Sequence, residues 1–174
     1  MDELGLSVRA GREEDAPAIR SIGIRTYVDH FSAIWGEEGL SRYLERHFAE
    51  DHIRRELRGT DTRYLVAYQG GEAIGFAKLN FNAPLPSGEG RGAELQKIYF
   101  LKGSTGRGYG ESLLKHCLSE AVARDEPFIW LDVLKSNAGA RAFYEKHGFK
   151  LVGEKAMDTD RMQIGLFVLA RPLR

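Results

Sequence analysis

The sequence is poor in cysteine, carries no net charge and lacks any long apolar run. Its single cysteine, Cys117, excludes an internal disulfide framework, so a core built from 174 residues must supply the stability. The 25 basic residues balance the 25 acidic ones, which argues against a nucleic-acid or anionic-membrane partner. Neither a stretch of about 18 apolar residues nor an N-terminal hydrophobic signal is present, so we expect a cytoplasmic location.

The patterns of several reactive sites are also missing. The five histidines have no metal-ligand spacing with each other or with Cys117, so we expect no metal. Cys117 lies between Leu114 and Leu118 on an apolar helical stripe, which favours a buried thiol over a nucleophile. A nucleoside-triphosphate loop would need Gly-Lys-Ser/Thr, and the chain has no such sequence.

The most informative stretch runs from Glu94 to Leu118 and predicts a strand, a glycine loop and a helix. Leu95–Leu101 is rich in β-formers, and the helix is marked by an apolar stripe that begins at Tyr109. Four glycines lie in or next to the loop, at positions 103, 106, 108 and 110. A helix start with exposed amides is positive and binds anions, and Arg107 would add a cation suited to a phosphate. The stretch therefore predicts a phosphate site, although a plain glycine-rich connection fits it equally well.

A dinucleotide site fits this loop less well. A fingerprint that starts at Gly106 would need Gly or Ala at position 111, and the chain has Glu111 there. Asp132 would offer the acidic residue that usually follows such a motif. Because the third glycine is misplaced, a nicotinamide-dependent oxidoreductase is the weaker interpretation.

The remaining pattern predicts a mixed sheet with helices on both faces. Ser136 or Asn137 should cap the last helix, and the proline- and glycine-containing segment 82–92 should form a mobile connection. The almost unbroken apolar run Phe128–Val133 suits an inner strand parallel to Leu95–Leu101. The other expected strands are Leu6–Arg9, Tyr64–Tyr68, Glu72–Phe81, Leu151–Glu154 and Met162–Leu169, and the expected helices are Glu13–Phe31, Glu37–Phe48, Asp51–Leu57, Tyr109–Ala121 and Ala138–His147.

Two motifs in this order resemble a known family. The run IYFLKGSTGRGYG and the later run WLDVLKSNAGARAFYEKHGFKLVGE are similar to the acetyl-CoA core of the GNAT superfamily of N-acetyltransferases. The family's loop, Gln/Arg-x-x-Gly-x-Gly/Ala, falls on residues 105–110, and Thr105 departs from its first position. The second motif, from Asn137 through Tyr144 to Phe149, is the more specific match, and a weaker resemblance covers nearly the whole chain.

The resemblance implies an α/β (α+β) fold and a function. The fold is one GNAT-like domain over residues 1–174, with a mixed, mostly antiparallel sheet of about seven strands and a central parallel pair. The implied activity is transfer of an acetyl group from acetyl-CoA, a co-substrate, to a primary amine in a ternary complex. The chain most resembles the bacterial polyamine (spermine/spermidine) acetyltransferases, and a homodimer is a family-level expectation.

The resemblance also assigns roles to residues. Asn137 would contact the CoA arm and Tyr144 would reach its sulfur as the acid, although an ordinary helix cap and a half-buried aromatic are the alternatives. The other residues expected to hold the cofactor, largely through backbone groups, are Ile98, Tyr99, Phe100, Thr105, Gly106, Arg107, Gly108, Tyr109 and Gly110.

The proton of the acceptor amine needs a base. An amine with a pKa near 10.4 costs roughly 4 kcal/mol to deprotonate at neutral pH, so a positioned acceptor matters. Glu94 opens the strand that enters the site and is the first candidate, while Asp132 is the second. Either carboxylate could instead be a solvated strand end, and His30 is expected to be structural.

The acceptor pocket is expected from the segment between Tyr27 and Tyr43. Its acidic residues Asp29, Glu37 and Glu38 could attract a cationic amine, with Arg25 and Arg42 nearby. A second functional class stays open here, namely a CoA-sensing or interaction module without turnover. Thr105 and the uncertain base are the observations that favour it.

Overall fold

Seven strands and five α-helices make up the parts of the chain that the computed structural model describes, residues 1–86 and 88–174. Ser87 falls in the expected connection 82–92 and lies outside the described residues. Two short 3-10 turns, Glu13–Asp15 and Ser32–Ile34, flank the first helix. The elements are β1 (Leu6–Ala10), α1 (Ala16–Phe31), α2 (Glu37–Phe48), α3 (Glu50–Arg58), β2 (Thr62–Gln69), β3 (Glu72–Pro84), β4 (Arg91–Phe100), α4 (Tyr109–Ala123), β5 (Phe128–Leu134), α5 (Ala138–Lys146), β6 (Lys150–Asp158) and β7 (Gln163–Pro172).

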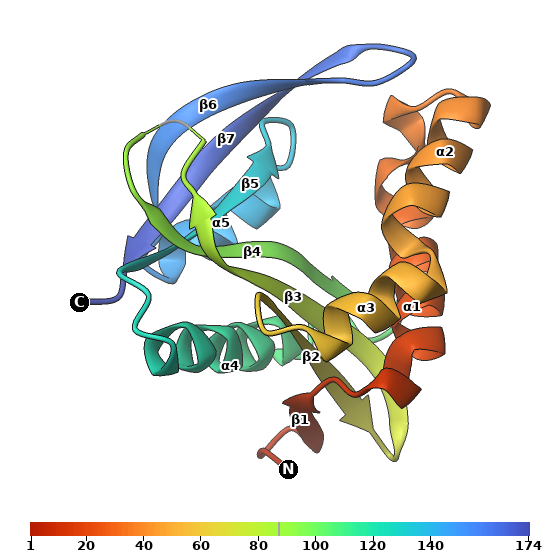
Figure 1. Ribbon diagram of the computed structural model, residues 1–174, viewed down its shortest axis with the longest axis vertical. Helices are drawn as coiled ribbons and strands as arrows, with labels where there is room; N and C mark the ends of the chain where they lie inside the picture. Colours follow the sequence, from red (N-terminus) through yellow and green to blue (C-terminus); the bar gives the residue numbers. More distant parts are fainter. Residues whose placement is uncertain (87) are drawn as a thin grey trace.

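The strands form one sheet in the order β1-β2-β3-β4-β5-β7-β6. Every neighbouring pair is antiparallel except β4 and β5, which run parallel at the centre (Figure 1). This confirms the predicted mixed, mostly antiparallel sheet with its central parallel pair. Strands β6 and β7 form the last hairpin of the chain. Its second strand, β7, pairs with β5, so β6 lies at the edge of the sheet.

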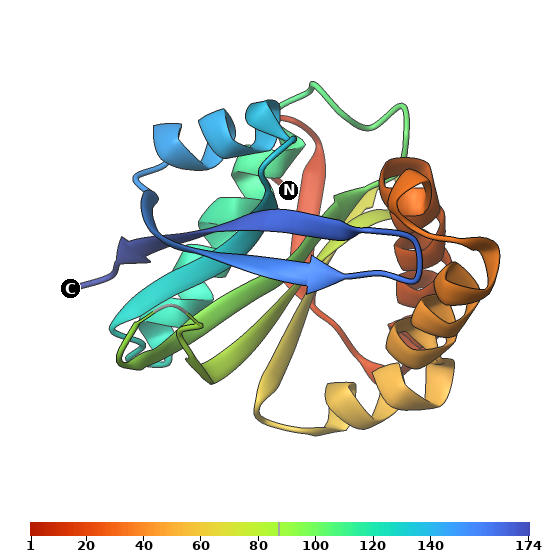
Figure 2. The ribbon, with the colours of Figure 1, turned by 90° about the horizontal axis from the view of Figure 1, so that it is seen from above.

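Helices cover both faces of the sheet, as the sequence predicts (Figures 1 and 2). Helices α4 and α5 pack on one face, where Leu113, Leu114 and Tyr144 join the main core with strand residues such as Leu131. Helices α1, α2 and α3 pack on the other face, where Ile19, Phe48 and Ile53 contact Tyr64 and Phe76. The apolar stripe that begins at Tyr109 is therefore buried, as the sequence predicts.

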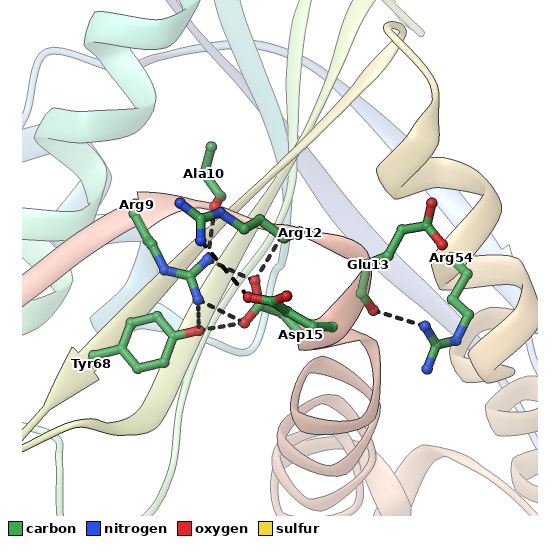
Figure 3. Close-up of polar contacts among 8 residues, drawn as sticks. Arg9, Ala10, Arg12, Glu13, Asp15, Arg54 and Tyr68 are labelled. Atoms are coloured by element: carbon green, nitrogen blue, oxygen red, sulfur yellow. Dashed lines mark hydrogen bonds and ion pairs between the residues drawn. The ribbon is translucent and has the colours of Figure 1, made fainter.

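The junction between β1 and α1 is fixed by a buried carboxylate, Asp15 (Figure 3). Arg9 donates to both Asp15 oxygens at 2.7 and 2.9 Å, and Tyr68 and the backbone NH of Arg12 also donate to it. Burial alone would raise the pKa of Asp15, but the hydrogen bonds from Arg9, Tyr68 and Arg12 hold it below its usual value. A buried charge with this many partners is satisfied, so it orients α1 against the sheet.

The ends of segment 82–92, expected as a mobile connection, belong to two strands. Strand β3 runs on to Pro84, and Ala83 and Pro84 pair with Gly92 and Arg91. Pro84 lies at the end of β3, where a missing amide is tolerated. Gly92 is required there, since a Cβ would lie 2.6 Å from the Phe128 carbonyl oxygen.

The last two strands are longer than the apolar pattern indicates. Strand β6 extends over Lys150–Asp158 and β7 over Gln163–Pro172, beyond the expected 151–154 and 162–169. No residue of β6 is fully buried, and its second half alternates only between half-buried and exposed side chains. The turn at residues 158–160 is placed as predicted, and Asn137 caps α5 with its side chain.

Among the described residues, no helix has both the length and the apolar character needed to cross a membrane.

Candidate functional site

The two parallel strands at the centre of the sheet pair only at their beginnings. Their register contains Ala93 opposite Ile129 and Glu94 opposite Trp130, and the pairing ends there among the described residues. Strand β4 continues to Phe100, but residues 98–100 pair on one side only, with β3. The other edge of β4 therefore offers main-chain NH and CO groups to a ligand, because such groups need partners. Ile98, Tyr99 and Phe100 are half-buried along this edge.

The loop that follows β4 is exposed and built on left-handed glycines. Gly103, Gly106 and Gly108 have φ angles of +88°, +74° and +80°, a region that side chains rarely adopt. Gly108 is the N-cap of the 15-residue helix α4, and no side chain in the described chain caps its amides. Neither Ser104 nor Thr105 does so, and Arg107 is exposed beside the loop. The start of α4 therefore keeps free donors with a positive dipole end.

The first turn of α4 contributes backbone groups only. The Tyr109 side chain is buried and its hydroxyl oxygen accepts a 2.5 Å hydrogen bond from Gln69 Nε2, so it cannot face a ligand. An added Cβ at Gly110 would lie 3.8 Å from Phe143, which places this turn beside α5. Ser112 donates to Asp2 at 2.7 Å, so one carboxylate also lies near the helix start. No pattern in the sequence indicates the hydrogen bond between Ser112 and Asp2.

Helix α5 positions both of the residues expected on it. Asn137 Oδ1 accepts from the Ala140 NH at 3.1 Å, so the cap that the sequence left as an alternative is present. Tyr144 is 9% exposed and packs with Phe143 and Phe149 at ring distances of 5.2 and 5.5 Å. Burial and the neighbouring Cys117 raise the pKa of Tyr144, which keeps its phenol protonated at neutral pH.

Tyr144 packs beside the free part of β4. It belongs to the cluster against which Ile98 and Phe100 pack, whereas the Tyr99 side chain packs with the cluster on the opposite face of the sheet. Burial raises the pKa of Tyr99, and the nearby Tyr27 and Tyr144 add to this effect.

The two candidate bases differ in their surroundings. Asn80 Nδ2 donates to Glu94 Oε2 at 2.8 Å, and Glu94 is half-buried at the last rung that joins β4 to β5. Asp132 Oδ2 is held in an ion pair by Lys155, while its Oδ1 is buried without a partner among the described residues. Glu94 thus contacts a neutral amide and has no ion pair among the described residues, whereas Asp132 is paired with a cation. His30 is exposed at the end of α1.

A buried lysine near Glu94 was not predicted. Lys97 is 6% exposed, lies on β4 three residues after Glu94, and places its Nζ 5.4 Å from the centre of the Phe48 ring. Its neighbour Lys78 pairs with Glu56 at 2.6 Å, but Lys97 has no ion pair in the described chain. Burial, followed by the charge of Lys78, lowers the pKa of Lys97 to about 7. A charged residue inside an apolar strand is the only signal for it in the sequence.

The lowered pKa of Lys97 predicts a specific pH dependence of stability. Its pKa is about 7 in the folded chain against 10.5 in the reference state, so the unfolded chain binds more protons between these values. The wild type should gain stability relative to Lys97→Met as pH rises from 6 to 10. Three pKa units correspond to about 4 kcal/mol, and water near the buried amine should reduce this to on the order of 2 kcal/mol. Urea unfolding at a series of pH values measures the difference.

Lys78→Met is the matched control for that experiment. This variant removes the partner of the half-buried Glu56 instead of a lone charge, so it should be less stable than the wild type at neutral pH. Parallel stability curves for the wild type and Lys97→Met over the whole pH range would contradict the assigned role of Lys97.

A cavity lies beside α2, on the face of the sheet that holds Lys97. Its volume is about 330 Å³, and its lining residues are Trp35, Gly39, Arg42, Tyr43, Arg46, His47 and Asp160. Asp29, Glu37 and Glu38, which are expected to attract a cationic amine, do not line it. All three are exposed, and Asp29 faces Lys102 at 3.9 Å.

The tip of the β6–β7 hairpin lies next to the start of α2 (Figure 1), and Asp160 from this tip lines the cavity. Asp160 accepts from the NH groups of Gly36 and Gly39, each at 2.8 Å, and Thr159 donates to the Ile34 carbonyl at 2.6 Å. A Cβ at Gly39 would lie 2.2 Å from the Asp160 carboxylate carbon, so this contact requires glycine. No sequence pattern predicts a cap that lies more than 120 residues away.

Comparisons with known proteins agree with this geometry. Residues 24–149 match the sequence model of the acetyltransferase (GNAT) family. An uncharacterised N-acetyltransferase of Lactobacillus delbrueckii is 25% identical over 86% of this chain and 87% of its own length. The PaiA N-acetyltransferase of Thermoplasma acidophilum, solved with coenzyme A, has a TM-score of 0.77 and 20% identity over 96% of this chain and 98% of that one. A spermidine N-acetyltransferase of Vibrio cholerae has a TM-score of 0.71 and 17% identity over 97% and 94% of the chains.

Proposed function

This chain belongs to the acetyltransferase (GNAT) family and is an acyltransferase with acetyl-CoA as its co-substrate, and we propose that it acetylates a primary amine of a small molecule by direct transfer. One observation carries the proposal: residues 98–100 of β4, which pair only with β3, lead to the uncapped start of α4, and Ile98 and Phe100 pack against the cluster that holds Tyr144. We propose that residues 1–174 act as one catalytic domain, supported by the single sheet to which all strands belong.

The chain's own groups fit the donor. The exposed amides at residues 106–110 would hold the pyrophosphate, with Arg107 at the rim and Thr105 too short to reach as a Gln or Arg would. The main chain of residues 98–100 would pair with the amides of the pantetheine arm, as a strand edge does. Asn137 would add its side-chain NH₂, because only its carbonyl oxygen is used by the cap.

Proton transfer is divided between two residues in the proposed mechanism. Glu94 receives the proton of the acceptor amine as its nitrogen bonds to the thioester carbonyl carbon. Backbone NH groups of β4 stabilise the negative charge that forms on the carbonyl oxygen. Tyr144 then gives its proton to the sulfur as the carbon–sulfur bond breaks, so the products are an amide and a free thiol. The proton on Glu94 returns to the phenol through solvent.

A panel of acceptors tests the proposed function. Purified protein should bind CoA by calorimetry and release thiol from acetyl-CoA with at least one amine from a panel of polyamines, amino acids, aminoglycosides and peptide N-termini. Polyamines belong in the panel because a spermidine acetyltransferase is among the structural relatives. CoA binding without turnover on any amine would instead support a sensor or interaction module. A homodimer and a cytoplasmic location stay predictions.

A further inference from the structure

The cavity beside α2 has one wall made by a single stripe of that helix. Gly39, Arg42, Tyr43, Arg46 and His47 follow the spacing i, i+3, i+4, i+7 and i+8, so they share one face. Trp35 and Asp160 complete the lining at the end where the β6–β7 hairpin meets α2. The wall therefore combines aromatic rings with two guanidinium groups.

The charge that this cavity offers a ligand is positive. Its single carboxylate, Asp160, already accepts two backbone hydrogen bonds at 2.8 Å. Burial, with the charges of Lys97 and Arg46, lowers the pKa of His47 to about 4, so this ring is neutral at pH 7. Arg46 has no ion pair among the described residues, and Arg42 lies 3.9 Å from a Glu38 that is 89% exposed. Two arginines thus face a cavity whose only acid is already bonded.

The cavity lies on the side of the sheet where Tyr99 of β4 packs. Tyr43, which lines the cavity, stacks on Tyr27 at 4.4 Å and contacts the His47 ring at 4.2 Å. Tyr27, Tyr43 and Tyr99 belong to one apolar cluster. Glu94 lies three residues before Lys97 on that strand, about 10 Å away along it. The aromatic cluster thus connects the lining of the cavity to the strand that carries Glu94.

We propose that the acceptor is a primary amine with an acidic group, a carboxylate or a phosphate, at its other end, and that Arg42 and Arg46 hold this group. The inference rests on the proposed acetyltransferase function and names its substrate class. A guanidinium binds either anion through two parallel hydrogen bonds, whereas a second ammonium group would be repelled. A polyamine, by contrast, would need a free carboxylate, and the single one in this lining, Asp160, already accepts two backbone hydrogen bonds.

Acceptors of equal length and different charge test this proposal. The set is δ-aminovalerate, cadaverine and n-pentylamine, together with the phosphonate analogue of δ-aminovalerate. We expect kcat/KM to be at least about tenfold higher for the acidic amines than for cadaverine, with pentylamine between them. The carboxylate and the phosphonate arms show which anion is preferred. Shorter and longer ω-amino acids then measure the distance from the arginines to the reacting amine.

Charge-reversal variants of the two arginines provide a second test of the proposal. We expect Arg46→Glu, alone or combined with Arg42→Glu, to raise the KM for the acidic amine about tenfold or more. The KM for acetyl-CoA should stay unchanged, and turnover of cadaverine should improve. A gain with cadaverine could not come from a damaged fold. Arg20→Glu, an exposed α1 arginine outside the cavity, is the matched control and should leave the preference unchanged.

Two outcomes would overturn the inference in distinguishable ways. Faster turnover of cadaverine than of δ-aminovalerate, unaltered by Arg46→Glu, would refute the acidic acceptor and leave acetyl transfer standing. Release of no thiol with any amine, from protein that binds CoA, would refute the proposed function and the inference with it.

Discussion

Glu94→Gln is expected to lower kcat/KM by about 10²–10³-fold at neutral pH, because the acceptor amine then has no side chain to receive its proton. Glutamine keeps the size of the side chain and can still accept the hydrogen bond from Asn80. The affinity for CoA, measured by calorimetry, should therefore stay the same. Stopped or continuous thiol detection under saturating acetyl-CoA measures the loss.

Asp132→Asn is the comparison that assigns the base. Asp132 is bound to Lys155, so its replacement should cost less than about tenfold in kcat/KM if Glu94 is the base. A larger loss in Asp132→Asn than in Glu94→Gln would reverse the assignment. Raising the pH should partly restore Glu94→Gln, since more of the acceptor amine is then already deprotonated.

Tyr144→Phe should lower kcat by about 10–10²-fold, with little change in the KM of either substrate. The phenylalanine ring keeps the packing against Phe143 and Phe149, and no hydrogen bond of the Tyr144 hydroxyl is found in the described chain. Stability should therefore change little. The variant lacks only the proton that Tyr144 gives to the departing sulfur. The loss of kcat should therefore be smaller with an acyl donor whose thiol has a lower pKa.

Tyr68→Phe is the matched control for that variant. Its hydroxyl donates to Asp15 and accepts from Arg9 at the β1–α1 junction (Figure 3). Its loss should cost about 1–2 kcal/mol in unfolding free energy, measured by urea titration, and leave kcat unchanged. Equal turnover of Tyr144→Phe and the wild type would remove Tyr144 from the mechanism.

The sequence predicts the sheet and the glycine loop with its helix well because their signals are local. Glycine at positions that need positive φ, an apolar helical stripe and the continuous run of β5 each act within a few residues. The spacing from Asn137 to Tyr144 likewise depends on one helix. Such patterns can be recognised in the sequence without knowing any tertiary contact.

The acceptor side could not be predicted for the opposite reason. Its cavity is formed where the β6–β7 turn meets α2, and Asp160 reaches Gly36 and Gly39 across more than 120 residues. The acidic residues of α2 suggested a cationic acceptor, but they do not line the cavity, whereas Arg42 and Arg46 of the same helix do. Lys97 was missed because its burial depends on Phe48 from another element.

A crystal structure of this protein with CoA tests the central claim most directly. We expect the pyrophosphate on the amides of residues 106–110, the pantetheine arm along residues 98–100 of β4, and the sulfur within about 3.5 Å of the Tyr144 hydroxyl. A CoA molecule bound elsewhere, or one whose sulfur lies beyond reach of both Tyr144 and Glu94, would contradict the account.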